Sequence, residues 1–176
     1  MPLFQKTSYL GAGRYGVVMA IFSGGVMAGY IFSSVVSISS DKKLKVFIFS
    51  AVICYLSLII GINQSIFILI TIFIALGGFF NSILNVILIS TIQLATPQEM
   101  RGKVMAFMSM ITQGLTPFAQ ALGGVLGGVI SIKLIISISF AIPIVLIIPF
   151  YFVKSFEEFI SYDYGKDRIE DVVKIK

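Results

Sequence analysis

Residues 46–98 read VFIFSAVICYLSLIIGINQSIFILITIFIALGGFFNSILNVILISTIQLATPQ, fifty-three positions without one Asp, Glu, Lys or Arg. Other charge-free runs of at least twenty residues occur at 15–40, 104–132 and 134–153. A helix needs roughly 20 apolar residues to cross the hydrocarbon core of a bilayer, and only helices and closed barrels satisfy every backbone group there. These runs are continuously apolar rather than alternating, which favours helices. The sequence therefore predicts an all-α, polytopic transmembrane helical bundle.

Short polar or charged segments divide this bundle into five predicted spans. The longest apolar run breaks at the turn 61–65, where Asn63, Gln64 and Ser65 fall together. We expect an external lead-in at 1–14, a transmembrane domain at 15–153 and a tail at 154–176. The predicted spans are 15–37, 46–61, 66–95, 104–130 and 134–153.

The basic residues predict which way the chain crosses the membrane. With five spans, three of the thirteen bases fall on one side, namely Lys6, Arg14 and Lys133. The other ten fall on the opposite side: Lys42, Lys43, Lys45, Arg101, Lys103, Lys154, Lys166, Arg168, Lys174 and Lys176. Because positively charged loops stay in the cytoplasm, we expect a multi-pass protein of the cell membrane with a cytoplasmic C-terminus and an external N-terminus.

The composition argues against several classes of function. The net charge of +5 is spread over short loops and the tail instead of a soluble domain, which gives no support for a nucleic-acid partner. There is no His, Cys54 is the single cysteine, and no Asp or Glu lies inside a predicted span. We therefore expect no metal site, no cofactor and no enzymatic activity. The expected surroundings of the chain are the lipid bilayer.

The segment 96–103, TPQEMRGK, separates the third and fourth predicted spans. Thr96 has the chemistry of an N-cap, Pro97 suits a first helical position, and Glu99 falls three residues after the cap. This pattern is typical of a capping box with proline in the first turn. It predicts a short helical turn that leads into the fourth span, with Arg101 and Lys103 at the membrane surface.

Several motifs carry a resemblance to a known family. PQEMRGKV at 97–104, QGLTP at 113–117 and GG at 123–124 resemble the cytoplasmic loop between helices ten and eleven of major facilitator superfamily exporters. PLF at 2–4, YGVVMA at 15–20 and GG at 24–25 are similar to the end of helix seven and the start of helix eight. The branch they look closest to contains macrolide-efflux and siderophore-export permeases. The first loop, 39–45, matches the family's Gly/Asp/Arg signature only in part.

The resemblance covers nearly the whole chain and implies a fold and a function. The family has twelve helices in two halves, so the chain is expected to hold helices eight to twelve, a fragment of the C-terminal half. The missing N-terminal half is then an expected partner, and an amphipathic small molecule is the expected substrate. The implied activity is that of a secondary transporter, an efflux permease or antiporter, in which the two halves rock around a central cavity.

Side-chain amides and hydroxyls in the third and fourth predicted spans are the candidates for the transport pathway. These residues are Asn81, Asn85, Gln113, Thr116 and Gln120. Polar side chains in a membrane face water, substrate or one another. The distribution favours the third and fourth spans as cavity helices and places the second and fifth against lipid, as the resemblance also implies. The alternative is that these groups only hydrogen-bond helices together.

Two further groups of residues are candidates for loop contacts and for helix packing. Cytoplasmic loop contacts or gating are expected of Asp41, Lys42, Glu99, Arg101, Gly102 and Lys103. Close helix packing is expected of the small-residue pairs Gly25, Gly29, Gly123, Gly124, Gly127 and Gly128.

Two other functions are compatible with the same sequence. The chain could be a small membrane subunit that binds a partner complex and transports nothing alone, with its glycine-rich faces as docking surfaces. An intramembrane enzyme ranks last, because the chain has no His and no acid inside a span.

Overall fold

The structure, a computed structural model, describes residues 11–161, apart from the side chains at positions 11, 12 and 41. Its helices are α2 (Gly11–Val35), α3 (Ser40–Asn63), α4 (Phe67–Ala95), α5 (Arg101–Leu126), α6 (Ile132–Phe150) and α7 (Lys154–Ile160). All regular elements in this range are helices, so the prediction of an all-α bundle is confirmed. The beginning of the predicted lead-in and most of the predicted tail lie outside the described residues.

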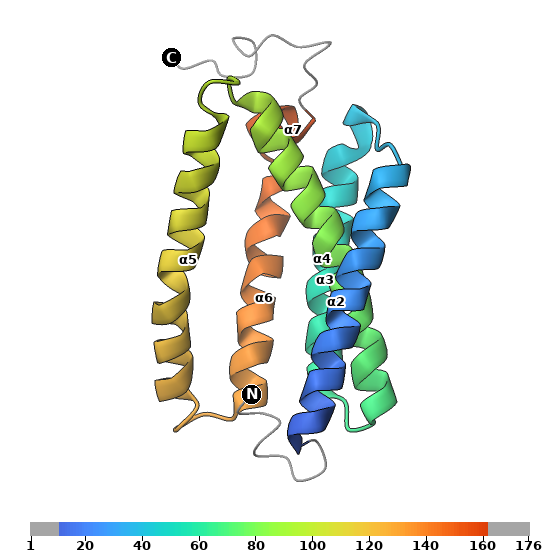
Figure 1. Cartoon of the computed structure of the whole chain (residues 1–176), viewed down its shortest axis with the longest axis vertical. Coiled ribbons are helices and arrows are strands. Elements are labelled where there is room, and N and C mark those ends of the chain that lie inside the picture. Colours follow the sequence, from blue (N-terminus) through green and yellow to red (C-terminus); the bar gives the residue numbers. More distant parts are fainter. Residues whose placement is uncertain (1–10, 162–176) are drawn as a thin grey trace.

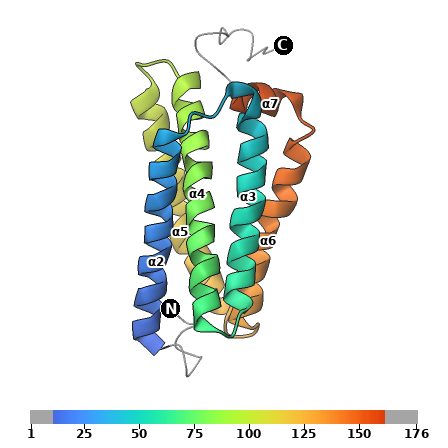
Figure 2. The same ribbon diagram turned by 90° about the vertical axis from the view of Figure 1, so that its right-hand side faces the viewer.

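The five long helices run up and down between two ends, and the short α7 lies across one of them (Figures 1 and 2). α4 packs against both α2 and α3, and α3 packs in turn against α6. Figure 2 shows these four helices side by side in the order α2, α4, α3, α6. α5 stands apart from them in Figure 1. The described core therefore lies along α3 and α4.

The contact between α2 and α4 is a backbone contact made possible by glycine. A Cβ added at Gly25 would meet the carbonyl oxygen of Ala75, and one added at Gly29 would meet Ser82 Oγ and the Phe79 carbonyl. On the facing helix, a Cβ at Gly78 would lie 2.6 Å from the Phe22 carbonyl oxygen. Helices in lipid gain stability from such close approach because lipid supplies no hydrophobic drive between them.

α3 occupies a more central place than its sequence predicts. The second span was expected to face lipid, but α4 and α6 pack against two sides of α3. The buried positions facing them are mostly small: Ser50, Ala51, Cys54 and Ser57. Small side chains let neighbours approach from two directions, and only the side with Phe49, Leu56 and Ile60 is exposed.

The start of the tail closes one end of the bundle. The Phe156 ring on α7 lies 6.0 Å from that of Phe47 and 4.9 Å from that of Phe150, centroid to centroid. Ile160 is fully buried. The apolar side chains of Phe156, Phe159 and Ile160, at the start of the predicted tail, pack into the end of the bundle.

Helix lengths and compositions partly match the five predicted spans. Within residues 11–161, four helices are long and apolar enough to cross a membrane, with spans at Gly13–Val35, Lys42–Asn63, Phe67–Ala95 and Ile132–Phe150. α5 has 26 residues but is not among them. Its apolar side chains are diluted by two bases, two glutamines and several glycines.

The predicted capping box at the start of α5 is wrong. Thr96 ends α4 instead, and its hydroxyl donates back to the Ile92 carbonyl over 2.6 Å. α5 begins at Arg101, and its N-cap residue, Met100, makes no capping hydrogen bond through its side chain. A threonine hydroxyl competes for local carbonyls, and those at the end of α4 are free to accept. The predicted short turn is present, since the Met100 and Arg101 amides donate to the Pro97 carbonyl.

Candidate functional site

The two asparagines of α4 form a hydrogen-bonded pair. Asn85 Nδ2 donates to the Asn81 backbone carbonyl over 2.8 Å and to Asn81 Oδ1 over 3.1 Å. Both side chains are half-buried. A polar group inside an apolar helix is costly unless it is satisfied. The pair satisfies the Nδ2 donor of Asn85 and the Oδ1 acceptor of Asn81. The remaining donors of Asn81 and acceptors of Asn85 are available to other groups.

Asn81 lies toward α3. One turn earlier on the same helix, Gly77 packs against α3, where an added Cβ would lie 2.7 Å from Leu58 Cδ2. Asn81 therefore lies on the side of α4 that packs against α3.

The candidates on α5 lie on a helix that the described residues leave uncovered. Gln113, Thr116 and Gln120 are all exposed, and α5 has no buried residue. The Thr116 hydroxyl donates to the Thr112 carbonyl over 2.8 Å, so it is satisfied within the helix. Pro117 lies in the helix interior and has no N–H to give the Gln113 carbonyl. This face of α5 therefore presents two amide side chains and a free backbone carbonyl.

The structure does not bring the two sets of pathway candidates together. α5 has no substantial contact with any other described helix, and in Figure 1 it stands apart from α4. The polar groups on α4 and α5 therefore form two separate surfaces within residues 11–161.

The candidates for loop contacts lie at one end of the bundle. The α2–α3 connection, the turn before α5 and α7 are all at the end drawn uppermost in Figure 1. Arg101 Nε donates to the Thr96 carbonyl over 3.1 Å, which holds the turn between α4 and α5. Lys42, Glu99, Gly102 and Lys103 are exposed, and the Asp41 side chain lies outside the described ones. The Arg101 side chain therefore stabilises the turn that precedes its own helix.

The glycine candidates divide into two groups. Gly25 and Gly29 lie against α4, as described above, whereas a Cβ added at Gly123 or Gly124 would meet nothing within 4 Å. At Gly127 and Gly128 the nearest atoms belong mainly to their own chain segment. The glycine-rich end of α5 is therefore open within the described part of the chain.

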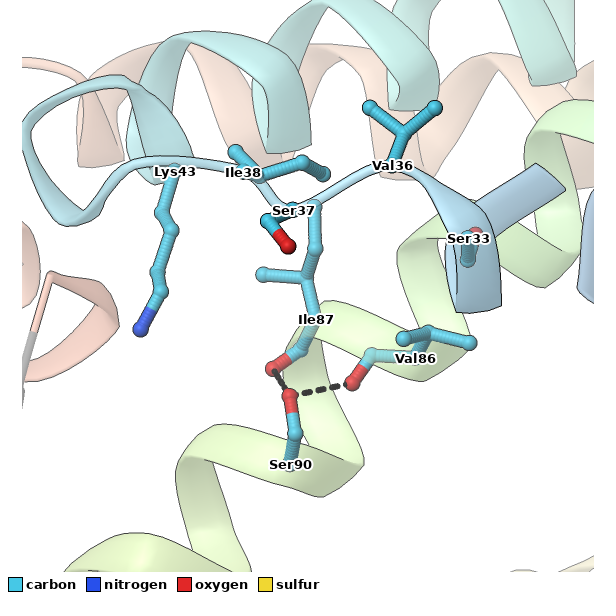
Figure 3. Close-up of a pocket in the computed structure, with 8 residues that line it drawn as sticks. All are labelled: Ser33, Val36, Ser37, Ile38, Lys43, Val86, Ile87 and Ser90. Carbon is cyan, nitrogen blue, oxygen red and sulfur yellow. Dashed lines mark hydrogen bonds between the residues drawn. The ribbon is translucent and has the colours of Figure 1, made fainter.

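Sequence reasoning missed two polar features. Asn63 Nδ2 donates to Ser137 Oγ over 2.9 Å, which connects α3 to α6 at the end opposite α7. A cavity at the α7 end is lined by four polar residues, Ser33, Ser37, Lys43 and Ser90 (Figure 3). The signals were present, since serines follow one another at the end of α2 and lysines at the start of α3. Their convergence on α4 depends on packing that the sequence does not show.

These features define a polytopic helical membrane protein with hydrogen-bonded polar pairs and an uncovered polar helix. The family model of the Major Facilitator Superfamily matches residues 1–160. The chain belongs to this superfamily and is a membrane transporter of the major facilitator type, a class distinct from enzymes. No curated protein and no solved structure matches the chain.

Proposed function

We propose that the chain is the C-terminal part of an efflux permease that moves an amphipathic small molecule by alternating access. The observation that carries this proposal is α5, whose amides and free carbonyl are covered by no described helix. Such groups are costly in lipid and are tolerated where they line a water-filled cavity or meet another helix. An N-terminal half facing α4 and α5 would enclose the cavity, and Gln113 and Gln120 would line it.

The test is transport by the longest reading frame that contains residues 1–176. It is expressed in cells that lack their major efflux pumps, and the accumulation of a panel of fluorescent amphipathic compounds is measured. We expect lower accumulation of at least one compound, and no such effect from residues 1–176 alone.

A matched pair of variants tests the assigned pathway. Gln113→Leu is expected to slow efflux by roughly fivefold to tenfold, because a lost hydrogen bond to substrate costs about 1 kcal/mol or more. Gln93→Leu makes the same change at an exposed amide of α4 outside the candidate set and should leave efflux unchanged. Equal effects of the two variants would contradict the assignment of Gln113 to the pathway.

A small membrane subunit is the second candidate, because a partner protein could cover α5 just as well. In that case the chain would purify from its native membrane with one partner at fixed stoichiometry, and the complex would show no efflux. One purification from the native membrane, followed by a transport assay after reconstitution, therefore distinguishes the two proposals.

A further inference from the structure

A cavity of about 180 Å³ lies between the end of α2, the start of α3 and the later part of α4. A water molecule takes about 30 Å³ in the liquid, so the cavity can hold a group of several heavy atoms. It is distinct from the pathway candidates on α4 and α5, and its ligand does not depend on what the protein transports.

The polar side of the cavity contains hydrogen-bond donors and one positive charge. Ser33 Oγ is buried and has no hydrogen-bond partner, a condition that a ligand or water normally relieves. Ser37 and Lys43 also line the space, and Figure 3 shows their side chains on the side facing α4. These groups match a phosphate, because hydrogen bonds from a cation to a phosphate oxygen are among the stronger ones in proteins.

Ser90 adds an acceptor to this set. Its hydroxyl hydrogen is used within α4, where Oγ donates to the Val86 and Ile87 carbonyls. The lone pairs of Ser90 Oγ therefore remain available to a ligand that carries its own hydroxyl group.

The other side of the cavity is apolar, and its depth is that of the membrane surface. Four branched side chains complete the lining: Val36, Ile38, Val86 and Ile87. The candidate spans end at Val35 and begin at Lys42, so the cavity lies where the hydrocarbon meets the headgroups. Lys43 lies at this level, and basic pockets between membrane helices are known to bind lipid headgroups.

We propose that this cavity binds an anionic phospholipid with a hydroxyl-bearing headgroup, of the phosphatidylglycerol type. Ser33, Ser37 and Lys43 donate to the phosphodiester, and the headgroup hydroxyl donates to Ser90 Oγ. The branched side chains contact the first carbons of an acyl chain. Lys43 carries a charge of opposite sign to that of the phosphodiester. A phosphatidylcholine headgroup offers no hydroxyl to Ser90 and carries no net charge.

The experiment measures lipid binding to the full chain purified in detergent. Phosphatidylglycerol, phosphatidylcholine and inorganic phosphate are titrated separately, and binding is followed by the rise in unfolding temperature and by native mass spectrometry. We expect phosphatidylglycerol to bind and to raise the unfolding temperature above the value with phosphatidylcholine. Equal effects of the two lipids, or an equal effect of inorganic phosphate, would overturn the proposal.

Two pairs of variants place the lipid in this cavity. Lys43→Gln and Ser33→Ala should each weaken phosphatidylglycerol binding, the lysine change by about tenfold. Their controls are Lys45→Gln and Ser34→Ala, which alter exposed neighbours outside the cavity lining and should bind as the parent chain does. Without lipid, Ser33→Ala should be at least as stable as the parent, because it removes an unsatisfied hydroxyl. Equal loss in a variant and its control, or no loss in Ser33→Ala, would overturn the proposal.

Discussion

At Gly29 the backbone of α2 lies directly against α4. Gly29→Ala would place a methyl group on Ser82 Oγ and on the Phe79 carbonyl, so the helices must separate. Overpacking of this kind costs about 1–3 kcal/mol, and we expect a lower unfolding temperature in detergent. Gly24→Ala is the control, because a Cβ there meets nothing within 4 Å. Equal destabilisation by both changes would mean that α2 does not approach α4 through Gly29.

The spacing of glycines in the sequence identifies candidate helix-packing pairs, but it does not identify the helix that each pair contacts. Gly25 and Gly29 share a spacing with Gly123 and Gly127, yet only at the first pair would an added Cβ clash with the backbone of another helix in the described chain. Gly78, which completes the contact from α4, belongs to no such pair in the sequence. A helix-packing motif shows that close approach is possible, and the facing helix decides whether it occurs.

Among the helices, α5 is expected to be the least protected. It has no buried residue, and Pro117 removes one hydrogen bond from its interior. Elements with few packed contacts open at low free energy, so its amides should exchange with deuterium at least about tenfold faster than those of α4, measured by hydrogen exchange with mass spectrometry in detergent. α4 is the internal control, because it packs against α2 and α3. Equal protection of both helices would show that something else covers α5 in the purified chain.

Helix ends were harder to predict than helices. The second span was expected to begin at residue 46, after the lysines, whereas α3 begins at Ser40 and includes them. A run of lysines marks the depth at which charge meets water, and lysine stems extend along a helix to reach it. The predicted cap at Thr96 failed for a related reason: the residue can serve the helix on either side, and the sequence does not say which.

For the whole molecule, the base count predicts orientation. We expect the end that contains the α2–α3 connection, the turn before α5 and α7 to be cytoplasmic. In a Cys54→Ala background, a membrane-impermeant maleimide should label Ser65→Cys in intact cells. It should label Glu99→Cys only after lysis, since both positions are exposed but lie at opposite ends. The reverse pattern would contradict the prediction.

The class of the molecule could be read from the sequence, but its internal arrangement could not. Charge-free runs of membrane length leave few alternatives to a helical bundle. The place of α3 between α4 and α6 was not foreseen, because an apolar helix in lipid carries no polar face to show which side is packed. The cavity at Ser33 and Lys43 was missed for the same reason: its lining comes from three helices and the α2–α3 connection, and the sequence does not show how these segments pack together.

The composition of α5 also bears on how the chain enters a membrane during synthesis. A translocon releases a segment into lipid according to its hydrophobicity, and α5 is the one long helix in residues 11–161 that is not a candidate membrane span by length and composition. Only residues 127–131 separate it from the strongly apolar α6. The two helices would therefore insert as one hairpin, with α6 supplying the partition energy. A ribosome that has finished α5 has not yet made the segment that keeps it in the bilayer.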